Sequence, residues 1–371
     1  MRTGWREEGD WVELVTAVSP ELGSCFRLGT NLHQIGDQMT TKTKTAPRKT
    51  TKPSVTASAK TKPAQASASK IGFLGLGIMG SAMSGNLLKA GFAVFGFDPS
   101  DAARARLKKA GGTPCTSMGE LAAQVDVIIA SLPHAQALFD AAHAVAQRGK
   151  KGLLMVDTST LDIDDKVTAQ KILAKQGITL LDCPLSGTGA QAVRKDLSVY
   201  SSGPAKAVQQ LTPVFEGFAK ANYYLGEFGN GMKMKLMANL LVAIHNVSTA
   251  EVLLFGERFG ISPEVAVKVL ADGAGGSRML DVRGPMMVNQ SWDQATMKVS
   301  VWQKDMKLIG AALAQTHTAA PLFAATIPVY NAAMGLGHAE NDTAAVFDVL
   351  SHMCVPKKAA KAKPKVKAKA K

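Results

Sequence analysis

The chain has few side chains of the kinds that cross-link a protein or bind a metal. Its four cysteines among 371 residues are far apart and form no Cys-x-x-Cys pair. This argues against a disulfide framework or a zinc site and favours a reducing compartment. The seven histidines show no ligand spacing either, so we expect no metal. No apolar run is long enough to span a membrane, so we expect no membrane partner and a cytoplasmic location.

Acidic residues are missing from two segments of the chain. Residues 39–70 contain seven lysines and one arginine, and residues 355–371 contain eight lysines, without one aspartate or glutamate. These sixteen positive charges exceed the formal net charge of +14 of the whole chain, so the remainder is slightly acidic. Such segments cannot bury enough apolar surface to fold alone. We therefore predict a disordered basic segment over 39–69 and a disordered lysine-rich tail over 355–371.

The basic tails suit polyanionic partners. The lysine, alanine and proline pattern of 357–371 resembles the tails of histone H1-like proteins, and it would hold phosphate backbones without reading their sequence. Nucleic acid, and with it the nucleoid, is thus one expected partner. A solubilising tail without a dedicated partner is the alternative. Residues 1–38 complete an N-terminal extension over 1–69. Either translation starts at Met39, so that 1–38 is not translated, or Trp11–Val18 forms a short accessory helix.

A glycine-rich turn lies directly after the apolar run Ile71–Leu74. It reads Gly75-Leu76-Gly77-Ile78-Met79-Gly80 and precedes a helical stretch, which is the order of a dinucleotide-binding motif. The first glycine of such a motif allows a tight turn, the second lets the backbone approach a pyrophosphate, and the third permits close packing of the helix. The helix N-terminus offers free N–H groups to the phosphates. These six residues are therefore predicted to bind a dinucleotide.

An acidic residue follows at the distance that this motif requires. Asp98 lies 18 residues beyond Gly80, at the end of the next apolar run. A carboxylate in that place accepts hydrogen bonds from a ribose 2′-hydroxyl and repels a 2′-phosphate. The next residues, Pro99 and Ser100, bring no arginine that could hold a phosphate. We therefore expect NAD as the cofactor, with NADP as the alternative; a plain turn residue before proline is the other interpretation of Asp98.

Apolar runs alternate with helical stretches after Asp98, which is typical of a parallel, doubly wound sheet. From Gly231 onward, helical stretches follow one another without a strand. We predict an α/β fold, with a Rossmann-type NAD-binding domain over 70–229 and an all-helical C-terminal domain over 230–354, joined by a long helix. The later strands are expected at 125–131, 153–157, 178–182 and 197–201. The helices are expected at 102–110, 135–146, 164–175, 233–259, 263–270, 299–315 and 322–335.

Two further segments indicate chemistry by their residue types. Ser186-Gly187-Thr188 offers small residues, hydroxyl groups and backbone N–H groups, which suit a carboxylate or another small oxyanion. Lys235 and Asn239 are four residues apart and share one face of the long helix. A lysine in the first turns of a helix, desolvated in a cleft, has a lowered pKa and can exchange protons. Lys233 is the competing candidate, and a solvated surface charge is the alternative for either lysine.

Taken together, these motifs resemble those of the β-hydroxyacid dehydrogenases, the group of 3-hydroxyisobutyrate dehydrogenase and tartronate semialdehyde reductase. The resemblance covers about residues 70–350. It implies that Lys235 is the catalytic lysine and that the family's usual dimers or tetramers form. The substrate contacts that it implies are Ser186, Gly187, Thr188 and Asn239. The cofactor contacts that it implies are Gly75, Leu76, Gly77, Ile78, Met79, Gly80, Asp98, Leu132, Pro133, Thr160 and Lys304.

The chain departs from the family pattern at three substrate-side positions. Thr188 stands where a second glycine is usual, Lys195 replaces another glycine, and Ala238 replaces the first asparagine of a pair. The first of these changes could crowd a substrate or add a hydroxyl contact, and the second adds a charge near the same loop. The catalytic lysine is retained, so these changes bear on the substrate more than on the reaction.

We therefore expect an NAD-dependent oxidoreductase that interconverts a small β-hydroxy acid and its semialdehyde by hydride transfer, with Lys235 as general acid and base. One alternative is a nucleoid- or chromatin-associated protein that uses a dehydrogenase-like body as an oligomeric platform for its basic tails. Another is an imine-reductase-like NAD(P) enzyme, although imine reductases generally replace the lysine. The related 6-phosphogluconate dehydrogenases carry a His-Asn pair after the lysine, where this chain has Ala238-Asn239.

Overall fold

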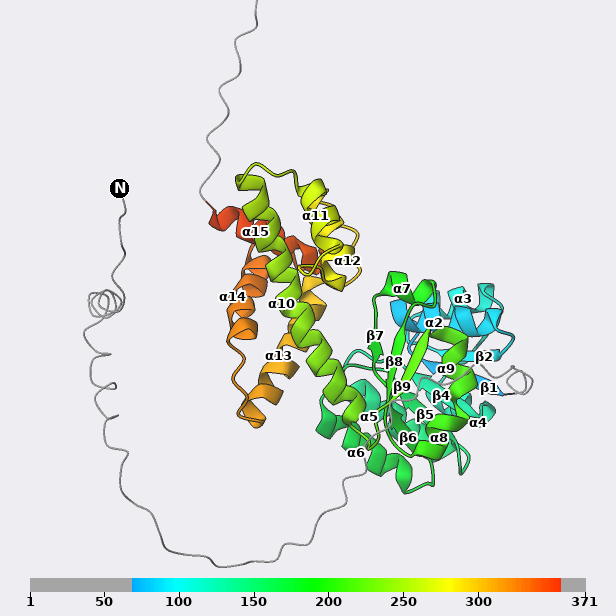
Figure 1. Ribbon diagram of the computed structural model, residues 1–371. Helices are drawn as coiled ribbons and strands as arrows, with labels where there is room; N and C mark the ends of the chain where they lie inside the picture. Colours follow the sequence, from blue (N-terminus) through cyan, green and yellow to red (C-terminus); the bar gives the residue numbers. More distant parts are fainter. Residues whose placement is uncertain (1–68, 355–371) are drawn as a thin grey trace, which may run out of the picture. The chain divides into compact units, whose positions relative to one another are not determined.

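The computed structural model describes residues 69–354 (Figure 1). The expectations for the N-terminal extension up to residue 68 and for the tail over 355–371 lie outside the described residues.

Six parallel strands form the central sheet, in the order β3-β2-β1-β4-β5-β6. The order reverses between β1 and β4, and ligands of such sheets bind at that reversal, outside the carboxyl ends of the strands. Leu74, the last residue of β1, pairs with Phe97 on one side and with Ala130 on the other. The strands are β1 (Lys70–Leu74), β2 (Ala93–Phe97), β3 (Thr113–Pro114), β4 (Val127–Ala130), β5 (Leu154–Asp157) and β6 (Thr179–Asp182).

Helices cover both faces of this sheet, which explains why its inner strands consist mainly of apolar residues. Neighbouring residues of β1 belong to different cores: Phe73 packs in one hydrophobic cluster and Leu74 in the other. The helices of the first cluster include α2 (Ile78–Lys89), α3 (Asp101–Lys109), α8 (Ala205–Gln210) and α9 (Thr212–Phe218). The helices of the second are α4 (Met118–Gln124), α5 (Ala135–Arg148) and α6 (Ile163–Ala174).

A second, three-stranded sheet holds the run that we expected to continue the parallel sheet. It consists of β7 (Leu185–Ser186), β8 (Ser198–Ser201) and β9 (Ala221–Tyr224). Strand β8 pairs with β7 in antiparallel and with β9 in parallel direction. The expectation for 197–201 was therefore wrong in topology. The short helix α7 (Gly189–Val193) and the left-handed residue Lys195 (φ 62°) turn the chain back after β7, so β8 enters in the opposite direction.

The C-terminal part is helical, and its first helix is its centre. Helix α10 (Asn230–Arg258) contacts all five helices that follow it. Trp302 and Tyr330 fill the core between them, with ring centroids 6.0 Å apart. The five are α11 (Pro263–Ala271), α12 (Arg278–Val288), α13 (Val299–Gln315), α14 (Pro321–Gly335) and α15 (Val346–Met353). The sequence did not predict α12, whose Gly284-Pro285 pair suggests a turn.

These findings confirm the fold class, a Rossmann-type sheet followed by a helical domain. One sequence expectation needs correction: by length and composition alone, α10 is long and apolar enough to cross a membrane. A core helix passes the same test, and 44% of its most apolar window is buried in this fold. The helix is therefore weak support for a membrane span, and the absence of a membrane partner stays a prediction.

Candidate active site

The glycine-rich turn joins β1 to α2 and is built by close backbone packing. Gly75 has a φ of +92°, and a Cβ on it would lie 2.3 Å from the carbonyl oxygen of Ser131. A Cβ on Gly80 would lie 2.0 Å from the carbonyl oxygen of Gly75. Gly77 is different, because it is exposed and a Cβ there would meet no atom within 4 Å. The turn is thus closed toward the protein and open above Gly77, as an approaching pyrophosphate requires.

Asp98 lies beside this turn, at the carboxyl end of β2. Its Oδ2 accepts a hydrogen bond from the Leu76 N–H at 2.8 Å, and its Oδ1 accepts one from the Ser100 N–H at 2.9 Å. Arg104 of α3 donates to the carbonyl oxygen of Asp98, and its guanidinium lies 5.9 Å from the ring centroid of Phe97. The sequence did not predict an arginine here, because the first turn of α3 separates Arg104 from the end of β2. Only the packing of α3 beside β2 shows that Arg104 reaches Asp98.

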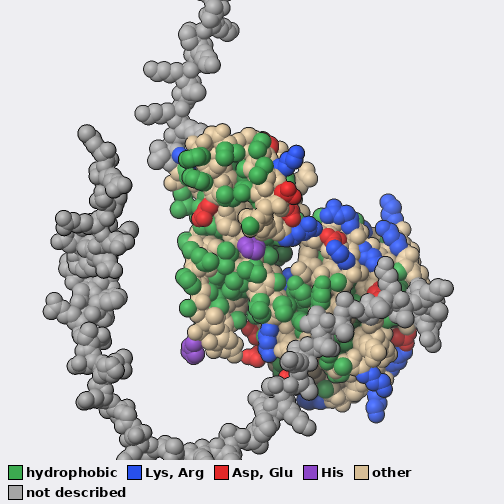
Figure 2. Space-filling view, viewed as in Figure 1, with side chains coloured by type: hydrophobic (Ala, Val, Ile, Leu, Met, Phe, Trp, Pro, Cys, Tyr) green, Lys and Arg blue, Asp and Glu red, His purple; other side chains and the backbone are tan. Residues whose placement is uncertain are grey.

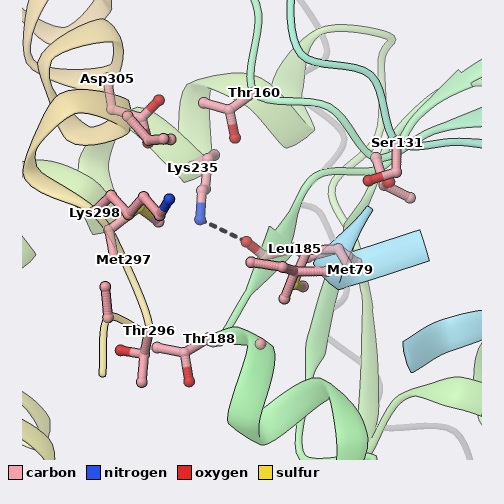
Figure 3. Close-up of a pocket in the computed structure, with 16 residues that line it drawn as sticks. Met79, Ser131, Thr160, Leu185, Thr188, Lys235, Thr296, Met297, Lys298 and Asp305 are labelled. Atoms are coloured by element: carbon pink, nitrogen blue, oxygen red, sulfur yellow. Dashed lines mark hydrogen bonds between the residues drawn. The ribbon is translucent and has the colours of Figure 1, made fainter. Parts of the chain in front are cut away.

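A pocket of about 380 Å³ opens between the strand ends and the helical part (Figure 3). Six of the predicted site residues line it: Ile78, Met79, Thr160, Gly187, Thr188 and Lys235. The other lining residues are Ser131, Thr158, Leu185, Gly189, Ala295, Thr296, Met297, Lys298, Val301 and Asp305. The pocket therefore joins residues from the dinucleotide turn, the Ser186–Thr188 turn, α10 and α13.

Lys235 projects into this pocket from the second turn of α10. Its Nζ donates a hydrogen bond to the carbonyl oxygen of Leu185 at 2.6 Å (Figure 3). Burial lowers the pKa of Lys235, the neighbouring ammonium of Lys304 lowers it further, and Asp305 opposes both. Lys233, the competing candidate, is exposed and donates to the side-chain oxygen of Asn230 at 3.0 Å. Of the two lysines, Lys235 alone lines the pocket, with an amine suited to proton exchange.

Asn239 and Lys304 do not line the pocket but bond to two residues that do. The buried amide of Asn239 donates to Oδ2 of Asp305 at 2.9 Å. Lys304 donates to the carbonyl oxygen of Thr160 at 2.6 Å. Asp305 itself lines the pocket, and burial raises its pKa even though Lys304 and Lys235 act to lower it. The sequence analysis did not single out Asp305; in the structure it links Asn239 to the pocket wall.

One N–H group of the Ser186–Thr188 turn is already bonded to a side chain of the following helix, α7. Gly187 has a φ of +131°, a conformation that glycine adopts most easily. The Thr188 N–H donates to the side-chain oxygen of Gln191 at 3.0 Å. The expectation that this N–H group is accessible to a carboxylate was therefore wrong. Gly187 and Thr188 still line the pocket, while Ser186 lies next to them in β7.

The loops after β4 and β5 are tied together beside the pocket. The Leu132 N–H donates to the hydroxyl oxygen of Ser159 at 2.8 Å, which fixes the loop that leads into the exposed Pro133. Thr160, the residue after Ser159, lines the pocket. Among residues 69–354, no group of three or more His, Cys, Asp or Glu side chains is placed to hold a metal ion.

A buried ionic network underlies the site and was missed by sequence reasoning. The Lys166 ammonium lies 2.7 Å from Oδ1 of Asp182 and 3.1 Å from Oδ2 of Asp157. All three side chains are fully buried. The other oxygen of Asp182 accepts a hydrogen bond from the Met232 N–H at 2.8 Å, in the first turn of α10. The network therefore fixes the start of the helix that carries Lys235.

The comparisons with known proteins agree with this geometry. Residues 70–226 match the NAD binding domain of 6-phosphogluconate dehydrogenase, and residues 229–350 match the NAD-binding domain of NADP-dependent 3-hydroxyisobutyrate dehydrogenase. L-threonate dehydrogenase of Cupriavidus necator is 31% identical over 293 residues, which cover 78% of this chain and 98% of that protein. 2-(Hydroxymethyl)glutarate dehydrogenase of Eubacterium barkeri is 28% identical, over 76% of this chain and 95% of that protein.

A solved structure is similar to this chain over about the same share of its length as these relatives. The structure of Mycobacterium tuberculosis 3-hydroxyisobutyrate dehydrogenase with L-serine superposes with a TM-score of 0.70 at 28% identity, over 76% of this chain and 99% of that one. These likenesses support the dehydrogenase interpretation rather than the platform or the imine reductase. The chain belongs to the β-hydroxyacid dehydrogenase family and is an NAD(P)-dependent oxidoreductase that acts on hydroxy acids or their semialdehydes.

Proposed function

We propose that Lys235 is the general acid and base of this enzyme, and that the substrate is a small β-hydroxy acid. The observation that carries the proposal is the Nζ of Lys235, held 2.6 Å from the Leu185 carbonyl inside the pocket. In its neutral form the amine donates to that carbonyl and keeps its lone pair for a substrate hydroxyl proton. In its protonated form it returns a proton to the carbonyl oxygen of the semialdehyde.

The carboxylate of the substrate would be held at the turn of Ser186, Gly187 and Thr188. Because the N–H of Thr188 already donates to Gln191, we assign the contact to the two hydroxyl groups and the N–H of Gly187. The role of Asn239 as a substrate contact stays a prediction. Its bond to Asp305 supports a contribution through that carboxylate, which lines the pocket.

The glycine-rich turn after β1 and the carboxylate of Asp98 fit a nicotinamide dinucleotide, which supplies the hydride chemistry when bound. Gly77 leaves open space where a pyrophosphate would lie, and Asp98 stands beside the turn for a ribose hydroxyl. The carboxylate supports a preference for NAD. Arg104 is a cation close to the same place, and NADP therefore stays the alternative cofactor.

An oligomer is supported by the apolar surface of the helical part. Figure 2 shows hydrophobic side chains gathered over these helices. On α10, Phe255 is 65% exposed and Phe259, just beyond the helix end, is 76% exposed. Their ring centroids lie 5.5 Å apart. Monomeric proteins rarely expose large contiguous apolar patches, so we propose that a second copy of the chain covers this surface in a dimer or tetramer.

The test of the function is cofactor-linked turnover by the purified protein. It is run with NAD and with NADP against a panel of small β-hydroxy acids, and with NADH and NADPH against the semialdehydes. We expect turnover of at least one β-hydroxy acid, with NAD preferred. If the protein binds NADH but turns over nothing on the panel, the assignment of Lys235 and of the substrate class is wrong.

The basic tails lead to a separate prediction. We propose that residues 39–69 and 355–371 tether a cytoplasmic enzyme to nucleic acid, because their charge is of one sign throughout. Removing both segments should abolish DNA binding and its steep dependence on salt, while NADH binding is unchanged. Electrophoretic mobility shifts at about 50 and about 200 mM salt measure this. Equal DNA binding by the shortened chain would refute the tether.

A further inference from the structure

The lining of the pocket includes a second lysine besides Lys235. Lys298 lines the pocket together with Thr296 and Met297, and Figure 3 shows its side chain extending into the space that Lys235 also enters. Nothing in the proposed reaction uses this side chain. Lysine is strongly hydrated and is an unfavourable lining for a pocket whose substrate is apolar at the end that meets it.

The backbone that carries Lys298 is held by a buried carboxylate. Oδ2 of Asp342 accepts hydrogen bonds from the N–H and the hydroxyl of Thr296, at 2.8 and 2.7 Å, and from the N–H of Met297 at 2.9 Å. Its Oδ1 lies 2.9 Å from Nε of Arg283, which is also buried. An antiparallel bridge joins Lys298 itself to Asp342. The cation therefore projects from a fixed segment and needs little reordering to meet a ligand.

The present partner of the Lys298 ammonium is weak. Nζ lies 2.6 Å from Oε2 of Glu340, but the two side chains are 44% and 73% exposed. Exposed pairs of this kind contribute little to stability, so Lys298 can exchange Glu340 for a carboxylate that enters the pocket. The only carboxylate that lines the pocket within residues 69–354 is Asp305, and Asn239 already donates to it.

We infer that Lys298 forms a distal anion subsite, and that the preferred substrates are β-hydroxy acids with a second carboxylate. The inference rests on the proposed function, because it places the first carboxylate at the Ser186–Thr188 turn and the reacting hydroxyl at Lys235. We place the remaining end of the substrate at Lys298, which lines the same pocket. A dicarboxylate places one carboxylate at the Ser186–Thr188 turn and the other at the ammonium of Lys298. A monocarboxylate leaves that ammonium without a substrate partner.

The experiment compares two substrates that differ only at this end. 2-(Hydroxymethyl)glutarate is 3-hydroxyisobutyrate with its methyl group extended to a propionate. For the full-length wild type we expect the higher kcat/KM with the dicarboxylate. In Lys298→Met, kcat/KM for the dicarboxylate should fall about 10- to 100-fold, mainly through KM, as expected for a lost hydrogen bond to a charged group. The value for the monocarboxylate should change less than about twofold, because its contacts are elsewhere.

Two further variants separate charge from folding. Lys307→Met removes an exposed lysine of α13, the helix that follows Lys298, outside the pocket lining, and should leave the ratio of the two kcat/KM values unchanged. Glu340→Gln removes the competing carboxylate and should raise that ratio. If Lys298→Met lowers both kcat/KM values alike, or if the wild type does not prefer the dicarboxylate, the subsite is refuted.

A binding measurement keeps the inference testable when turnover is absent. Glutarate, an unreactive dicarboxylate, is titrated into the wild type and into Lys298→Met by calorimetry. A Kd at least tenfold weaker in the variant supports the subsite even if the reaction proposed above is wrong. An equal Kd in both proteins overturns the subsite, whatever the activity of the enzyme proves to be.

Discussion

Replacing Lys235 with alanine is expected to lower kcat by about 10³-fold, within the range of a lost general acid or base. The amine is the proton-exchanging group that lines the pocket next to the proposed carboxylate turn, and alanine leaves the Leu185 carbonyl without its donor. NADH should still bind, because the glycine-rich turn and Asp98 belong to other elements. Steady-state turnover and a fluorescence titration with NADH measure the two quantities separately.

Lys233→Ala is the matched control for this variant. Lys233 lies two residues earlier on the same helix, is exposed, and contacts the side chain of Asn230. Its removal should change kcat by less than about twofold, as expected for a surface position away from the chemistry. A large loss of kcat with Lys233→Ala and none with Lys235→Ala would show that Lys233, not Lys235, is the catalytic lysine.

The wild-type pH profile follows from the same group. Oxidation requires the neutral amine, so kcat/KM for the hydroxy acid should rise as pH rises through the pKa of Lys235. Burial lowers that pKa, and the rise should therefore occur well below the range of an ordinary exposed lysine. Reduction requires the protonated amine, and its rate should fall over the same interval. A profile for oxidation that stays flat up to the range of an exposed lysine would contradict this assignment.

Local sequence patterns predicted the parts of the site that are built from neighbouring residues. The turn from Gly75 to Gly80 lies between a strand and a helix, and its glycines meet carbonyl oxygens at 2.3 and 2.0 Å where side chains would not fit. Such steric requirements are visible in the sequence. Lys235 was also predictable, because its place after Gly229 and Gly231 puts it in the first turns of a long helix.

Other parts depend on contacts between distant segments and could not be predicted. Asn239 meets Asp305 across 66 residues, and Lys298 reaches the pocket because Asp342 holds its segment. No spacing rule connects such pairs. Lys166 left a signal: it lies on the buried stripe of α6 with Ala169 and Leu173. A lysine on an apolar stripe indicates a buried partner, but the sequence does not say which acid.

Lys166→Met is expected to destabilise the protein by about 3–5 kcal/mol, the cost of breaking a buried ion pair. Burial alone would lower the pKa of Lys166, but the carboxylates of Asp157 and Asp182 outweigh it and raise the pKa, so the amine stays charged. Methionine fills a similar volume and leaves two buried carboxylates without a counter-charge. Urea unfolding of the full chain measures the loss. Lys171→Met, at an exposed position of the same helix, should cost less than about 0.5 kcal/mol.

The destabilisation should depend on pH in a way that simple loss of packing would not. In the variant, one buried carboxylate can relieve the repulsion by taking up a proton, and the folded state then binds more protons than the unfolded state. Its stability relative to the wild type should therefore recover as pH falls from about 8 to about 5. Activity should fall as well, because Asp182 accepts from the Met232 N–H and thereby holds the first turn of α10. A stability difference that is the same at every pH would show that Lys166 acts through its volume and not through its charge.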